Sequence, residues 1–295
     1  MSRENVVWVD GVVCSMEAAG VSPVAHGLHY GTGVFEGVRC YATSQGPAVF
    51  RLPEHLARMK RGADALAMPF DEAAVTGGVV DLLRANGLSE AYVRPLSYYE
   101  SGGLSLDVAP LHARHLVAAM PWKSHLGSTE ERGGVRLHTS SVRRTAASAV
   151  PPLKLCGNYV NAILAKLEAT RAGYDEALFV DEQGYVCEAT GENVFFVKDK
   201  QVIAVAHPDA LPGITRATVL DLSGGVERAV TLEELRDADE IFLTGTSAEL
   251  AAVGTFDARR LAPGPVTREL ARLYQAAVHG ESELSRGWLL PISAS

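Results

Sequence analysis

The chain has 295 residues, 47% of them hydrophobic and 21% charged, a globular composition that argues against disorder and is long enough for two domains with separate cores. Its formal net charge is −8. Because nucleic-acid affinity depends mainly on clustered Lys and Arg side chains, we expect no nucleic-acid partner.

The first third of the chain alternates strand-like and helix-like segments. Residues 5–13 contain two apolar stretches around a D-G pair, which favours the tight turn of a hairpin. Residues 53–68 repeat apolar residues at helical spacing after a proline suited to a first turn. Residues 91–99 are aromatic and β-branched, which predicts a strand. The polar, turn-rich segment 121–133 is the predicted interdomain linker.

The second half of the chain begins with its most regular helical pattern, residues 158–173. Val160, Ile163, Leu164 and Leu167 share one face of this predicted helix, and Gly173 is a suitable C-cap. Strands are predicted at residues 176–181, 185–190, 193–199 and 201–205, a turn opening a helix at 212–222, a strand entering a polar turn at 238–250, and a helix at 265–278.

These elements predict a mixed α/β protein of the α+β type with domains at 1–120 and 134–295, because no regular βαβ alternation demands a doubly wound sheet. No apolar run could span a bilayer, and the N-terminal apolar segment is too short for a signal peptide. The four cysteines are scattered without a C-x-x-C pair, which suits a reducing compartment. We therefore expect a cytoplasmic protein without a membrane partner.

Three motifs resemble functional signatures without matching them. The segment "GTGVFEG" is similar to a dinucleotide-binding loop, but its third glycine lies one residue late and no acidic residue follows at the required distance. The pairs "HGLH" (His26, His29) and "HARH" (His112, His115) have spacings that a metal could use, yet lack nearby carboxylate or thiolate partners. We expect structural histidines and no metal site.

Lys154 lies between Leu153 and Leu155, just ahead of the predicted helix. Its ammonium group either extends along apolar surface to reach water or is held inside the protein. Desolvation lowers the pKa of a lysine, and the neutral amine is the nucleophile that forms a Schiff base with an aldehyde. Taken alone, this position favours the first interpretation.

A pyridoxal phosphate enzyme needs further groups. A carboxylate must keep the pyridine nitrogen protonated, and Glu188, in an otherwise apolar predicted strand, is a candidate unless it faces water at a sheet edge. The phosphate requires backbone N–H groups at a helix start, a hydroxyl and a cation. Ile214 and Thr215, Thr246, and Arg58 could supply these. Each alone is more often a cap, a turn or a solvated charge, but their joint occurrence favours a cofactor site.

The sequence resembles the class IV, fold type IV pyridoxal phosphate aminotransferases, and among them the branched-chain amino acid aminotransferases. The matching segments run in the family's order from about residue 26 to residue 275. They are "HGLHYGTGVFEGVRCY", "FRLPEHLARM", "AYVRPL", "KLCGNYVNAILAKLEATRAGYDEALFVDEQGYVCEATGENVFFVKD", "ALPGITR", "ADEIFLTGTSAE" and "GPVTRELARLY".

The resemblance implies a cofactor site for pyridoxal 5′-phosphate. Lys154 would form the internal aldimine and move the proton between the substrate Cα and C4′ of the cofactor. Glu188 would pair with the pyridine nitrogen, and Tyr159 would bond the phenolic oxygen. The phosphate would be held by Arg58, Ile214, Thr215 and Thr246.

The resemblance also implies a substrate site. Arg94 occupies the position that meets the distal carboxylate of glutamate, although a buried ion-pair partner is an alternative interpretation. An apolar pocket with one arginine could take both an aliphatic side chain and glutamate. We therefore expect ping-pong exchange between a branched-chain or other hydrophobic L-amino acid and 2-oxoglutarate. The remaining implied residues are Tyr30, Phe35 and Tyr92 lining the pocket, and Thr246, Ser247 and Ala248 facing the α-carboxylate.

For the fold, the resemblance implies a small N-terminal α/β domain, a larger C-terminal pseudo-barrel domain and a cofactor between them. It also implies a homodimer or higher homo-oligomer, in which the partner's loop near "SGGLSLDVAP" closes the pocket.

Departures from the family pattern are concentrated near the substrate. His125 stands where the branched-chain enzymes usually carry a pocket tyrosine, "GLSLDVAP" replaces a loop bearing glycine and asparagine, and "LDLSGGVERAV" is short. A D-amino acid or (R)-amine transaminase, or an aminodeoxychorismate-type lyase, therefore stays an alternative, although Arg94 and Tyr92 favour the branched-chain pattern. A non-catalytic cofactor-binding protein is disfavoured by the intact lysine, glutamate and phosphate set.

Overall fold

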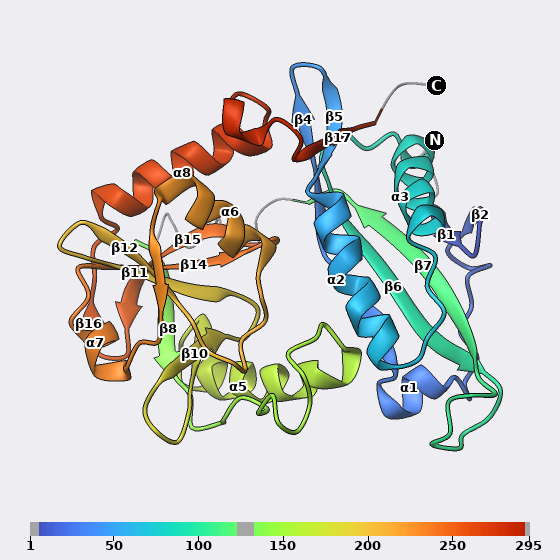
Figure 1. Cartoon of the computed structure of the whole chain (residues 1–295), viewed down its shortest axis with the longest axis horizontal. Helices are drawn as coiled ribbons and strands as arrows, with labels where there is room; N and C mark the ends of the chain where they lie inside the picture. Colours follow the sequence, from blue (N-terminus) through green and yellow to red (C-terminus); the bar gives the residue numbers. More distant parts are fainter. Residues whose placement is uncertain (1–5, 123–132, 293–295) are drawn as a thin grey trace. The chain divides into compact units, whose positions relative to one another are not determined.

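The computed structural model describes residues 6–122 and 133–292, and its chain divides into two compact units (Figure 1). Unit 1 comprises Met1–Trp122, Leu153–Asn158 and Val278–Ser295, and unit 2 comprises Lys123–Pro152 and Tyr159–Ala277. The chain first leaves unit 1 within the predicted linker. The predicted continuous domain 134–295 differs from unit 2, because two of its segments group with unit 1.

Unit 1 is built on an antiparallel sheet with strand order β17-β5-β4-β6-β7-β1-β2, and β3 pairs with β6 (Figure 1). Its strands are β1 (Val6–Val9), β2 (Val12–Ser15), β3 (Gly33–Phe35), β4 (Val38–Thr43), β5 (Gly46–Phe50), β6 (Ala91–Ser101), β7 (His112–Met120) and β17 (Leu289–Pro291). Its helices are α1 (His26–Tyr30), α2 (Leu52–Ala65), α3 (Glu72–Asn86), and the short 3₁₀ helices η1 (Cys156–Asn158) and η2 (Glu283–Ser285).

The local signals in unit 1 explain its elements. The predicted hairpin forms as β1–β2, with positive φ at both Asp10 and Gly11, as its tight turn requires. Helix α2 confirms the pattern of residues 53–68, and α3 begins where the Asp71 side chain accepts a hydrogen bond from the Ala74 N–H. Apolar side chains of both helices bury the main core against the sheet.

Unit 2 contains a mixed sheet with strand order β10-β9-β8-β15-β14-β11-β12-β13, with β16 paired to β15 (Figure 1). Its strands are β8 (Val135–Thr139), β9 (Glu176–Val180), β10 (Val186–Ala189), β11 (Asn193–Lys198), β12 (Gln201–Val205), β13 (Val226–Arg228), β14 (Glu240–Gly245), β15 (Glu249–Phe256) and β16 (Arg259–Arg260). Its helices are α5 (Tyr159–Arg171), α6 (Ile214–Ser223), α7 (Leu232–Arg236) and α8 (Pro265–Val278). Every strand and helix predicted for this half is confirmed.

Helix α5 presents its large apolar side chains to solvent. Val160, Ile163, Leu164 and Leu167 are between 44% and 59% exposed, whereas the buried face consists of Ala162, Ala165 and Ala169. The last two of these alanines pack beside Phe179 and Cys187 of β9 and β10. The small alanine side chains let the helix lie close to the sheet. The apolar face predicted from the sequence points the other way and is exposed.

Within the described residues, no helix combines the length and apolar character needed to cross a membrane. The cytoplasmic location stays a prediction from the sequence.

Candidate active site

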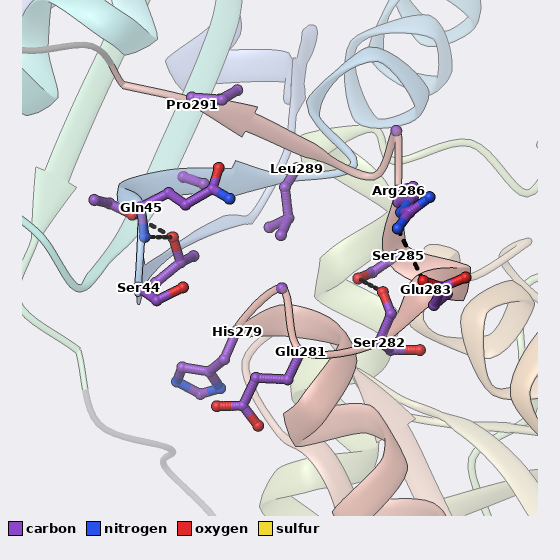
Figure 2. Close-up of a pocket in the computed structure, with 15 residues that line it drawn as sticks. Ser44, Gln45, His279, Glu281, Ser282, Glu283, Ser285, Arg286, Leu289 and Pro291 are labelled. Carbon is purple, nitrogen blue, oxygen red and sulfur yellow. Dashed lines mark hydrogen bonds and ion pairs between the residues drawn. The ribbon is translucent and has the colours of Figure 1, made fainter.

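Cavity volume does not identify the functional site. A cavity of about 370 Å³ in unit 1 lies between the β4–β5 turn and the segment that follows α8 (Figure 2). Its lining is polar and includes Ser44, Gln45, Glu281 and Ser282. A cavity of about 350 Å³ in unit 2 is lined by residues from 205 to 229. Neither cavity contains a residue predicted to bind cofactor or substrate.

Lys154 is held against β3 within unit 1. The Phe35 N–H donates a hydrogen bond to the Lys154 carbonyl oxygen at 3.2 Å, and Val34 and Leu155 form an antiparallel bridge. The Lys154 side chain is half-buried, and its Nζ lies 5.2 Å from the centroid of the Phe35 ring. The amine is thus placed over an aromatic face rather than extended freely into water.

The glycines of "GTGVFEG" make room for the segment that carries Lys154. Gly31 has φ +66°, and a Cβ built on it would lie 2.8 Å from the Gly157 Cα. The Gly157 N–H donates to the Gly31 carbonyl oxygen at 3.2 Å. A Cβ on Gly33 would lie 3.0 Å from Cys156 Sγ. The motif that resembles a dinucleotide loop therefore serves close backbone packing beside the lysine.

Arg58 is buried on α2 and binds Glu36 with two hydrogen bonds. Its Nε donates to Glu36 Oε1 at 2.7 Å and its Nη2 donates to Oε2 at 2.9 Å. His55 Nδ1 also lies 2.8 Å from Oε2, and all three side chains are buried. Burial raises the pKa of Glu36, but Arg58 and His55 outweigh it, and the pKa lies well below its ordinary value. The sequence points to Arg58 but not to Glu36.

Arg94 lies beside two of the three aromatic residues predicted to line the substrate pocket, Phe35 and Tyr92. Its guanidinium lies 4.7 Å from the Phe35 ring centroid and 5.2 Å from that of Tyr92, and its Nη2 donates to Tyr92 Oη at 2.7 Å. Among the residues that the structure describes, no carboxylate forms an ion pair with Arg94, and its buried Nε has no hydrogen-bond partner. This arrangement differs from the alternative in which Arg94 is a buried ion-pair partner.

Tyr30 lies in a different group of residues. Its hydroxyl donates to the Leu104 carbonyl oxygen at 3.2 Å, and its ring centroid lies 4.6 Å from that of His26. His26 Nε2 lies 2.9 Å from the Ser105 carbonyl oxygen. Tyr30 and the first histidine of "HGLH" therefore fasten the loop that contains "SGGLSLDVAP". No group of metal ligands was found within residues 6–122 and 133–292.

In unit 2, Glu188 is buried at the end of a strand rather than facing water. Its Oε1 accepts from Arg144 Nε at 2.8 Å, and its Oε2 accepts from the Leu211 N–H at 2.9 Å and more weakly from Asn193 Nδ2 at 3.5 Å. Arg144 Nη1 in turn donates to Asn161 Oδ1 at 3.2 Å. These donors favour the ionised carboxylate, which can accept a ring N–H. The sequence does not point to Arg144.

The predicted phosphate donors of unit 2 lie at a helix start and in a turn. Ile214 and Thr215 are the first residues of α6, whose N-cap is Gly213 without a side-chain cap. A Cβ on Gly213 would lie 1.9 Å from Asn193 Oδ1, so the loop carries no side chain there. Asn193 Nδ2 also donates to the Leu211 carbonyl oxygen at 2.9 Å, which ties this loop to Glu188. Backbone N–H groups at such a helix start suit an anion.

The predicted residues thus form one set in each unit. Unit 1 holds Tyr30, Phe35, Arg58, Tyr92, Arg94 and Lys154, and unit 2 holds Tyr159, Glu188, Ile214, Thr215, Thr246, Ser247 and Ala248. His125 lies outside the described residues. The donor chemistry in both sets fits a phosphorylated pyridine aldehyde: an amine, a cation, an ionised carboxylate and a helix start.

The family model described as "Amino-transferase class IV" matches residues 33–255. The chain therefore belongs to the class IV aminotransferases, as its resemblance implied.

Named relatives extend the match over nearly the whole chain. The branched-chain-amino-acid aminotransferase of Pseudomonas aeruginosa is 36% identical over 97% of both chains. The crystal structure of the T.th. branched-chain amino acid aminotransferase complexed with N-(5′-phosphopyridoxyl)-L-glutamate matches with TM-score 0.93, at 39% identity, covering 99% of this chain and 100% of that one. The PLP-form from Thermobaculum terrenum matches with TM-score 0.91 and 32% identity over 100% of both chains. The predicted fold type IV architecture is confirmed.

Proposed function

We propose that this aminotransferase exchanges the amino group of a branched-chain or similar hydrophobic L-amino acid with 2-oxoglutarate in two half-reactions at one site. The observation that carries the proposal is Arg94 between Phe35 and Tyr92. The two rings offer apolar surface to an aliphatic side chain, and the guanidinium offers charge-assisted hydrogen bonds to the second carboxylate of glutamate. A site that alternates between such substrates needs both features.

The cofactor of this class IV aminotransferase is pyridoxal 5′-phosphate, in keeping with the phosphopyridoxyl and PLP forms of its structural relatives. When bound, it supplies an electrophilic aldehyde carbon and an electron-withdrawing ring. Lys154 Nζ would hold it covalently in the free enzyme and, once released as an amine, would accept the proton from the substrate Cα. Glu188 would stabilise the protonated ring nitrogen. Tyr159 would bond the phenolic oxygen, and Arg58, Ile214, Thr215 and Thr246 would hold the phosphate.

The remaining predicted residues complete the substrate site. Thr246, Ser247 and Ala248 form the turn between β14 and β15, and they face the substrate α-carboxylate in this proposal.

The active form is a homodimer or higher homo-oligomer in this proposal. The exposed face of α5, formed by Val160, Ile163, Leu164 and Leu167, supports it, because a contiguous apolar surface favours a protein contact. Leu106, in the loop fastened by Tyr30 and His26, is 80% exposed. This loop closes the pocket of the partner subunit.

A half-reaction screen tests the proposal. Purified protein mixed with a single amino acid should lose its yellow absorbance with L-leucine, L-valine or L-glutamate, and not with D-amino acids or (R)-amines. Lys154→Ala should abolish turnover. Loss of the band with D-alanine or (R)-amines alone, or release of pyruvate without an amino acceptor, would instead support the alternative reactions on this fold.

A further inference from the structure

Glu36 is a fully buried carboxylate that no step of the proposed reaction uses. It is 0% exposed and follows β3 directly. Its two oxygens accept from Arg58 Nε and Nη2 at 2.7 and 2.9 Å, and Oε2 also bonds His55 Nδ1 at 2.8 Å. Because an ionised carboxylate only accepts, His55 carries its proton on Nδ1 here. Burying a charged group is costly unless it is paired and hydrogen-bonded. A carboxylate kept at such a position therefore points to a role in structure or in function.

The same short segment fixes two parts of the proposed cofactor site. Phe35 donates its N–H to the Lys154 carbonyl oxygen, and the next residue, Glu36, holds the Arg58 guanidinium. Helix α2 approaches this segment closely, since a Cβ on Gly62 would lie 2.9 Å from Val34 Cγ1. Two adjacent residues at the end of β3, Phe35 and Glu36, therefore set the distance between the Lys154 backbone and Arg58.

We propose that Glu36 is a positioning residue for the cofactor phosphate, acting through Arg58. The inference rests on the proposed role of Arg58 as a phosphate ligand. Two parallel hydrogen bonds fix the plane of the guanidinium through its Nε–Nη2 edge, so a phosphate meets N–H groups whose direction is already set. An arginine ordered in advance loses less rotamer entropy when the phosphate binds. His55 holds the carboxylate from its other side.

Electrostatics alone predicts the opposite effect. A carboxylate beside Arg58 cancels part of its positive charge and so weakens its attraction for a phosphate. If this cancellation dominated, removing the charge of Glu36 would tighten phosphate binding. If positioning dominates, as proposed, removing one of the two hydrogen bonds between Arg58 and Glu36 weakens phosphate binding. The two views differ in the sign of one measurable quantity.

The test compares apoenzyme binding of pyridoxal 5′-phosphate with binding of pyridoxal, which lacks the phosphate. The ratio of the two dissociation constants reports the phosphate contribution alone and requires no turnover. Glu36→Gln keeps the side-chain size but can accept only through one oxygen, and its amide N–H groups face other donors. We expect the preference for the phosphorylated form to fall about tenfold or more, as for loss of a charge-assisted hydrogen bond.

Two further variants separate positioning from stability. Glu36→Asp keeps the negative charge, so Arg58 keeps a charged partner and the protein should fold. The shorter side chain cannot reach both Nε and Nη2 of Arg58, so the phosphate preference should fall here as well. Glu240→Gln is the matched control, since Glu240 is also buried and accepts from the Thr267 N–H at 2.7 Å in unit 2. It should lower the melting temperature and leave the preference unchanged.

An unchanged or increased phosphate preference in Glu36→Gln and Glu36→Asp would overturn the positioning role. A wild-type protein that binds pyridoxal 5′-phosphate no better than pyridoxal would instead overturn the proposed cofactor site, and the two failures are distinct.

Discussion

Arg144 Nε donates to Glu188 Oε1 at 2.8 Å, and both side chains of this ion pair are almost wholly removed from solvent within unit 2. The second carboxylate oxygen accepts the Leu211 N–H. The pair links the proposed ring-nitrogen partner to Asn161 on α5, because Arg144 also donates to that amide. A positive charge at this distance favours the ionised carboxylate on which the proposed chemistry depends.

We predict that Arg144→Met makes turnover depend on pH. Without the guanidinium, the charge that favours the ionised form of Glu188 is gone, so the carboxylate takes up a proton more readily as the pH falls. The protonated acid cannot stabilise the positive ring nitrogen, and activity should be lost at low pH and recover toward alkaline pH. Breaking a buried pair costs about 3–5 kcal/mol, so the melting temperature should fall too.

The profile of kcat against pH checks this prediction. Arg143→Met is the matched control, because Arg143 donates to the Val180 carbonyl oxygen and to no carboxylate among the described residues. Coincident profiles for Arg144→Met and the wild type would show that Arg144 has no influence on Glu188.

Arg94 should separate the two half-reactions. In Arg94→Leu, glutamate loses the partner of its distal carboxylate, whereas leucine keeps the Phe35 and Tyr92 surfaces. A hydrogen bond between charged groups contributes about 1.5–3 kcal/mol, so the glutamate half-reaction should slow roughly 10- to 150-fold with little effect on leucine. Single-turnover kinetics with each amino acid measure the ratio. Equal losses for both substrates would place Arg94 outside the substrate site.

The exposed face of α5 should govern oligomeric state. Leu164→Glu places a charge on this face, and burying an unpaired charge in a subunit contact costs about 3 kcal/mol or more, a dissociation constant on the order of 100-fold higher. Sedimentation at several protein concentrations checks this. Leu284→Glu is the control, because Leu284 is a similarly exposed leucine, at 59%, that belongs to unit 1 and not to the α5 face. Identical sedimentation of both variants and the wild type would remove this face from the contact.

The local signals of the sequence were sufficient for the elements that they predicted, but not for the orientation of α5. Periodicity groups Ile163 and Leu164 on one face, and it cannot tell whether the sheet or a partner covers that face. The alanine face that contacts the sheet carries a weaker hydropathy signal. Lys154 likewise belongs with unit 1 through its pairing with β3, a long-range contact without a local pattern.

The residues that hold the site were harder to predict than those proposed to carry its chemistry. Lys154, Glu188 and Arg58 occur in segments that resemble a family. Their partners are distant in sequence: Glu36 lies 22 residues from Arg58, and Arg144 lies 44 residues from Glu188. A signal for Glu36 was present, since a carboxylate between Phe35 and Gly37 in an apolar stretch requires a buried partner.

Replacing Gly31 should weaken both folding and cofactor binding, because Gly31 has a positive φ and also lies against Gly157. In Gly31→Ala, the new Cβ would lie 2.8 Å from the Gly157 Cα, so the turn that follows Lys154 must move. Left-handed backbone costs a non-glycine residue about 1–2 kcal/mol, and overpacking adds about 1–3 kcal/mol. We expect both a lower free energy of unfolding and weaker binding of pyridoxal 5′-phosphate.

Gly46→Ala separates these effects, because Gly46 has φ +105° and nothing within 4 Å of an added Cβ. Chemical denaturation and cofactor titration should show that Gly46→Ala loses stability but keeps wild-type cofactor affinity. Equal cofactor affinity in both variants would mean that the contact between Gly31 and Gly157 does not position the lysine.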